Sequence, residues 1–99
     1  MKLRVTPEAE QQYEVIDSWW RLNRDKAPEL FAQEVERVLA LLPTAPDMGP
    51  VYTAAGGVVV RRVLMKKTHH YLYYWVDREG DVIEVLSFWG LPLRDGPPL

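Results

Sequence analysis

The chain has 99 residues, 47% of them hydrophobic and 26% charged, with a formal net charge of −2 and no cysteine. These values indicate one globular domain over residues 1–99 and exclude a disulfide framework, a thiolate metal site and a uniformly basic nucleic-acid binder. No apolar run is long enough to span a bilayer and Met1 is not followed by a signal-peptide core, so we expect a cytoplasmic protein with no membrane partner.

Residues 1–5 predict a short first strand, and Thr6 followed by Pro7 predicts the start of a helix. Apolar residues then recur at a 4–3–4 spacing that predicts one buried helix face: Ala9, Tyr13, Ile16 and Trp20. Three more apolar residues widen this face: Val15, Trp19 and Leu22. We therefore expect this helix to be covered on more than one side, with the two tryptophans in core and helix–helix packing.

A second helix is predicted to begin at Pro28, because the residue before a proline avoids the helical region. Its apolar stripe consists of Phe31, Val35, Val38, Leu39 and Leu42. The polar residues between them are expected to face water: Gln33, Glu34, Glu36 and Arg37. Since the break between the two helices is short, they should form an antiparallel hairpin.

Residues 43–57 hold three prolines and three glycines and predict a loop. The remainder is rich in β-branched and aromatic residues and predicts strands over 58–67, 69–76 and 82–89, with a turn at 77–81. The order β-α-α-β-β-β favours an α+β fold in which a helical hairpin packs on one face of an antiparallel sheet. The other sheet face stays open, and function is expected there.

The stretch 61–75 carries four cations, two histidines, three tyrosines, one tryptophan and no acid. A nucleic-acid surface, a general acid/base site, a docking patch for an acidic partner and two ordinary β-strands all remain possible. Period-two alternation directs one set of side chains towards the helices: Val59, Val63, Met65, His70, Leu72, Tyr74 and Val76. The alternate set should lie on the open face: Arg62, Leu64, Lys66, His69, Tyr71, Tyr73 and Trp75.

Cations beside tyrosines suit a phosphodiester, because arginine binds phosphate in bidentate fashion and aromatic rings stack on bases. If the chain is a ribonuclease, Arg62, Lys66 and Tyr71 are the catalytic candidates. The tyrosines also suit ordinary sheet packing, and Arg61 and Arg62 could form a solvated edge or an ion pair with Glu84. His69 and His70 point to opposite faces of a strand, so we expect no metal site and no cofactor.

Several segments together resemble the ParE/RelE superfamily of type II toxins, in its ParE-like, plasmid-stabilisation branch. The matching segments, in chain order, are V-T-P-E-A from Val5, I-x-x-W-W-R-x-N-R from Ile16, A-P-E-L-F-x-x-E-V from Ala27, the Pro46–Gly49 loop, R-R-V-L from Arg61, H-Y-L-Y-Y-x-V-D from His70 and V-L-x-x-W-G from Val85, with G-P-P-L at the end. Relatives often have two arginines after the Trp-Gly pair; here Pro92 and Leu93 replace them, and Arg94 follows.

The resemblance implies a growth-inhibiting bacterial toxin in a heteromeric complex with a cognate antitoxin that has a DNA-binding head and an amphipathic tail. Some members cut mRNA on the ribosome and others poison DNA gyrase without being enzymes. Because the C-terminal arginines are missing, we favour gyrase poisoning over ribosome-dependent cleavage or a non-toxic antitoxin-binding module. The target-binding candidates are Arg61, Arg62, Lys66, Lys67, Tyr71, Tyr73 and Arg94. The candidate antitoxin anchors are Trp19, Leu22 and Phe31.

Overall fold

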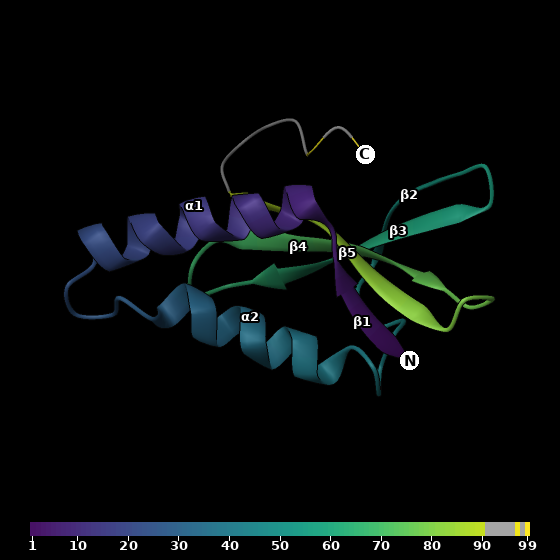
Figure 1. Cartoon of the computed structure of the whole chain (residues 1–99), viewed down its shortest axis with the longest axis horizontal. Helices are drawn as coiled ribbons and strands as arrows, with labels where there is room; N and C mark the ends of the chain where they lie inside the picture. Colours follow the sequence, from purple (N-terminus) through teal and green to yellow (C-terminus); the bar gives the residue numbers. More distant parts are fainter. Residues whose placement is uncertain (91–96, 98) are drawn as a thin grey trace.

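The computed structural model describes residues 1–90, 97 and 99, and its elements follow the order β-α-α-β-β-β-β (Figure 1). The helices are α1 (Pro7–Asn23) and α2 (Leu30–Leu41). The strands are β1 (Lys2–Val5), β2 (Val51–Ala55), β3 (Val58–Met65), β4 (His70–Asp77) and β5 (Val82–Gly90). The predicted α+β fold is therefore confirmed, with one additional strand, β2, that the sequence pattern does not predict.

The five strands form one sheet in the order β1-β5-β4-β3-β2. The strands β2 to β5 pair antiparallel, whereas β1 runs parallel to β5, so the sheet is mixed. The extra strand β2 lies within the predicted loop 43–57. Gly56 and Gly57 have positive φ values of 60° and 83°, which close a two-residue hairpin between β2 and β3.

Both helix starts have a local cause. Thr6 caps α1 as predicted, because its hydroxyl accepts a hydrogen bond from the Ala9 amide at 3.2 Å. The second helix starts at Leu30 and not at Pro28. The amides of Ala27 and Leu30 bond to the carbonyls of Arg24 and Ala27, so the chain makes two tight turns before α2 begins.

The core lies between the helical hairpin and one face of the sheet (Figure 1). Its helix side is the predicted stripe of α2 with Ala9, and its sheet side comes from alternate residues of β3, β4 and β5: Met65, Leu72, Tyr74, Ile83, Val85 and Phe88. The alternation predicted for residues 70–76 is thus confirmed, whereas His69 lies in the turn before β4 and not on the strand. On β3 the alternation holds for Val63 and Met65, while Val59 is exposed.

Two predictions about the helices are wrong. Among the described residues, the face of α1 that carries Val15, Trp19 and Leu22 stays largely exposed, because the helix packs against the core through Ala9, Tyr13, Ile16 and Trp20. Glu34 does not face water; it is buried at 4% exposure. Its carboxylate accepts hydrogen bonds from the Lys67 and Thr68 amides and the Thr68 hydroxyl at 3.2, 2.9 and 2.6 Å. These bonds tie α2 to the turn 66–69 between β3 and β4.

Candidate functional site

Four side chains on the open sheet face form an arginine–tyrosine cluster: Tyr52, Arg62, Tyr71 and Tyr73. The Arg62 guanidinium lies 4.1 Å from the centre of the Tyr71 ring and 5.1 Å from that of Tyr52. It also donates a hydrogen bond of 3.4 Å to the Tyr73 hydroxyl. Three strands contribute to the cluster, since Arg62 pairs with Tyr73 across β3 and β4 while Tyr52 comes from β2.

The rings of the cluster also pack on one another. Tyr73 is only 1% exposed, and Tyr52 covers it edge-on with ring centres 4.8 Å apart. The hydrogen bond to the Tyr73 hydroxyl is the main cause that raises the pKa of Arg62 above its usual value, and the nearby tyrosines add smaller contributions. Within the described residues Arg62 makes no ion pair, so its positive charge is held among aromatic rings and is not neutralised by an acid.

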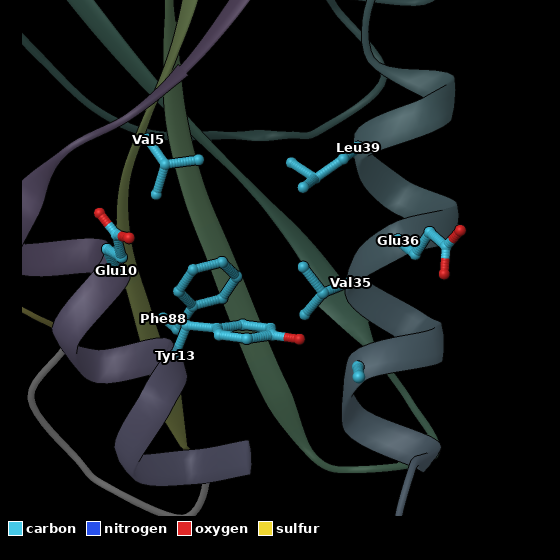
Figure 2. A pocket seen from close by; sticks show the side chains of 8 residues that line it. Val5, Glu10, Tyr13, Val35, Glu36, Leu39 and Phe88 are labelled. Carbon is cyan, nitrogen blue, oxygen red and sulfur yellow. The ribbon is translucent and has the colours of Figure 1, made fainter.

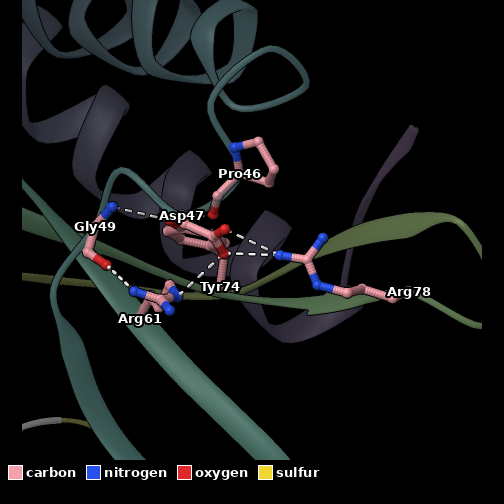
Figure 3. Close-up of polar contacts among 6 residues, drawn as sticks. All are labelled: Pro46, Asp47, Gly49, Arg61, Tyr74 and Arg78. Atoms are coloured by element: carbon pink, nitrogen blue, oxygen red, sulfur yellow. Dashed lines mark hydrogen bonds and ion pairs between the residues drawn. The ribbon is translucent and has the colours of Figure 1, made fainter.

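Arg61 lies on the opposite side of β3 and does not join the cluster. It donates to the Gly49 carbonyl at 2.9 Å and approaches Asp47 at 3.7 Å, while Arg78 bonds to the same Asp47 at 2.9 Å (Figure 3). The expected ion pair of Arg61 or Arg62 with Glu84 is therefore wrong. Glu84 instead accepts hydrogen bonds from Arg4 at 2.9 Å and from the Trp75 indole at 3.1 Å.

Tyr74 fixes the segment that leads into β2. Its hydroxyl donates to the Pro46 carbonyl at 2.8 Å and accepts from the Gly49 amide at 3.0 Å (Figure 3). A Cβ atom on Gly49 would lie 2.7 Å from the Arg62 carbonyl, so only glycine allows this approach. The network thereby holds β2, and with it Tyr52, beside Arg62.

The remaining target-binding candidates lie elsewhere. Lys66 and Lys67 are exposed in the turn 66–69 beyond the end of β3, and no contact joins either side chain to the cluster within the described residues. Arg94, Pro92 and Leu93 lie outside the residues that the structure describes. The structure thus brings together Arg62, Tyr71 and Tyr73, and it adds Tyr52. One sequence feature could have placed Tyr52 on a strand, namely the Gly56-Gly57 pair that follows VYTAA. Such a pair between β-prone segments predicts a hairpin.

The helical side holds a groove of about 510 Å³ between α1 and α2 (Figure 2). Tyr13 and Phe88 lie at its centre, with Val35 on the facing helix, and Glu10 and Glu36 stand at its rim. Of the antitoxin anchors, Trp19 and Leu22 are 47% and 80% exposed. Phe31 is fully buried in the core and cannot serve as an anchor.

His70 belongs to the core side of β4, where it packs edge-on against Phe31 with ring centres 5.2 Å apart. Its Nδ1 atom lies 2.7 Å from the Thr68 carbonyl and must donate to it. Burial lowers the pKa of His70 below its usual 6.5, because desolvation disfavours the imidazolium.

Neither of the helices in the described part of the chain is long and apolar enough to cross a membrane.

Comparisons with other proteins agree with this fold. The family model of the ParE toxin of the type II toxin–antitoxin system parDE matches residues 3–90. No curated protein matches the chain.

Two solved structures show the likeness at the level of the fold. A chain of the chromosomal ParDE system from P. aeruginosa superposes with a TM-score of 0.70 at 21% identity, over 91% of this chain and 95% of that one. The isolated toxin RelE of E. coli superposes with a TM-score of 0.63 at 14% identity, over 95% and 87% of the two chains.

Proposed function

Because the chain belongs to the ParE toxin family and is the toxin component of a type II toxin–antitoxin system, we propose that it stops growth by binding DNA gyrase and that a cognate antitoxin neutralises it. Gyrase binding inside the cell requires a cytoplasmic location, which forms part of the proposal.

The arginine–tyrosine cluster is the observation that supports action by binding. It offers a guanidinium and three phenol rings, which can hold a phosphate or a carboxylate and stack on a planar group. It contains neither a histidine nor a carboxylate, the usual general acids and bases of catalysis near neutral pH. His70 is next to Tyr71 in β4, but its side chain points to the other side of the strand and packs against Phe31. A binding surface therefore fits these residues better than a ribonuclease site does.

The antitoxin is proposed to cover the helical side of the molecule. The groove between α1 and α2 is lined mainly by apolar side chains, and an amphipathic helix places such a side chain every three or four residues (Figure 2). The exposed Trp19 and Leu22 lie on another part of α1 and offer further apolar surface. We therefore expect the amphipathic tail to contact both α1 and α2 while the open sheet face serves the target.

Expression in bacteria tests the function as a whole. The chain expressed alone should arrest growth, and coexpression with the product of the adjacent gene should restore it. Purified chain should inhibit DNA supercoiling by gyrase and leave ribosome-bound mRNA intact. Arg62→Ala should weaken the inhibition by at least about tenfold, because arginine is enriched among the interface residues whose truncation costs about 2 kcal/mol or more.

Arg37→Ala is the matched control, since Arg37 is an exposed arginine on α2 and makes no ion pair among the described residues. It should leave both growth arrest and supercoiling inhibition unchanged. Cleavage of ribosome-bound mRNA that Arg62→Ala abolishes would replace gyrase poisoning by a ribonuclease function. Normal growth on expression of soluble, folded chain would instead support a non-toxic module that only binds the antitoxin.

A further inference from the structure

A second groove lies beside the C-terminal half of α1, where Trp20 also packs against the core. It has a volume of about 680 Å³ and runs between the C-terminal half of α1 and the turn 66–69. We call it the tryptophan groove and define it by six of its lining residues: Val15, Trp19, Trp20, Arg24, Lys67 and His69. Val15 and Trp19 are 66% and 47% exposed, so the described part of the chain leaves apolar surface open here.

Arg24 is held against both indoles of this groove. Its guanidinium carbon lies 5.2 Å from the centre of the Trp19 ring and 5.8 Å from that of Trp20. The two rings stand edge to face with centres 5.9 Å apart. Cation–π contact occupies the flat faces of a guanidinium and leaves the N–H groups at its edge for another acceptor.

The charge of the groove has one sign. No residue that lines it in the described part of the chain is Asp or Glu, whereas Arg24 and Lys67 are cations and His69 is an exposed imidazole. Neither Arg24 nor Lys67 forms an ion pair within the described residues. Residues 1–50 carry nine acids against six cations, Arg24 included, so the positive groove contrasts with the acidic balance of the half of the chain that holds α1. The groove between α1 and α2 differs, because Glu10 and Glu36 stand at its rim.

We propose that the tryptophan groove binds an acidic, apolar segment of the antitoxin tail, a proposal that rests on the antitoxin partnership proposed above. An aliphatic or aromatic side chain of that segment covers Val15 and Trp19, and a neighbouring carboxylate bonds to the edge of Arg24. Lys67 attracts further acids. The same segment is repelled by Glu10 and Glu36, so the two grooves select different parts of one tail by charge.

Isothermal titration of the purified chain with synthetic 15-residue peptides that tile the tail of the adjacent gene's product tests the proposal. The tightest peptide for this groove should contain Asp or Glu beside apolar residues, and its affinity should fall as salt rises. Arg24→Glu should weaken it by about 30-fold or more, as expected for the loss of a central interface arginine. Exchanging the peptide's acid for lysine should restore binding to the Arg24→Glu chain. Val15→Ser should cost about tenfold.

Two exposed residues outside the groove serve as controls, Lys26→Glu for charge and Val51→Ser on β2 for apolar surface. Both should leave the affinity within about twofold, a change that corresponds to the small effects expected of side chains outside an interface. Thermal unfolding of each variant checks that it is folded.

The possible failures are distinguishable. If the unmodified chain does not bind the full-length product of the adjacent gene, the antitoxin partnership itself fails. If it binds that product but Arg24→Glu and Val15→Ser change nothing, the groove assignment is wrong and the partnership stands. The unmodified chain could also prove to be a dimer and the Arg24→Glu chain a monomer. That result would show that a second copy occupies the groove and would also overturn the proposal.

Discussion

The arginine–tyrosine cluster and the tryptophan groove both place an arginine against aromatic rings. Within the chain, however, only the arginine of the cluster makes close contacts with buried groups. Arg62 lies 4.1 Å from its nearest ring and bonds to the hydroxyl of Tyr73, which is almost fully buried. Arg24 lies 5.2 Å from its nearest ring, and about half of that ring is open to solvent. The cluster is therefore ordered before any ligand arrives, whereas the groove gains most of its contacts only when a partner covers it.

The first prediction separates the core from the uncovered face of α1. Phe31→Ala should lower the free energy of unfolding by about 3–5 kcal/mol, because Phe31 is fully buried and a cavity remains. Leu22→Ala should change it by less than about 0.5 kcal/mol, since Leu22 is largely exposed. Urea denaturation measures both, and similar losses for the two variants would contradict the assigned burial.

The second prediction concerns the wall of the tryptophan groove. Glu34→Ala should cost about 2–4 kcal/mol, because two buried or partly buried amides and a hydroxyl lose their acceptor. It should also weaken binding in the groove, since the turn 66–69 loses its tie to α2. Glu36→Ala, an exposed change on the same helix, is the control for denaturation and should be nearly neutral.

The third prediction tests how β2 is held. Tyr74→Phe should cost about 1–3 kcal/mol, because the Gly49 amide loses a buried acceptor. It should reduce gyrase inhibition through the displacement of Tyr52, while antitoxin binding stays unchanged. Equal losses of both activities would mean that the network supports the whole molecule and not the open face in particular.

The fourth prediction compares the two arginines. Arg62→Lys keeps the charge but loses the planar group that stacks on Tyr71, so the concentration needed to inhibit supercoiling should rise about tenfold. Arg24→Lys should leave that concentration unchanged, because Arg24 lies on the helical side. A similar effect of the two variants would remove the functional distinction between the faces.

The smallest expected effect is a pH dependence from His70. Its pKa is lower in the folded chain than in the unfolded chain, so the unfolded state binds the proton first as the pH falls. The contribution to stability is full above pH 6.5 and is lost as the pH falls from there towards the folded pKa. His70→Gln should flatten the stability profile below pH 6.5, which urea denaturation at a series of pH values measures.

Period-two alternation was enough to separate Tyr73 from Tyr74 and to bring Arg62 beside Tyr71, because both strands are regular between Val60 and Trp75. Tyr52 was missed since a Pro- and Gly-rich segment can hide a short hairpin strand. Helical spacing predicts that Glu34 faces water. It does not reveal that the amides of a distant turn will bond to this carboxylate and bury it. The uncovered face of α1 was unpredictable for a related reason: apolar spacing does not show whether the neighbour is the same chain or a partner.

The uncovered apolar surface formed by Val15, Trp19 and Leu22 also affects how the protein behaves in solution. Exposed patches of this kind promote self-association at high concentration, and a ligand that binds only the folded state raises its population. An antitoxin that covers this surface would therefore act as a solubilising partner as well as an inhibitor. The soluble yield of the chain should depend on its coexpression, and loss of the antitoxin would release a toxin that is active but prone to aggregate.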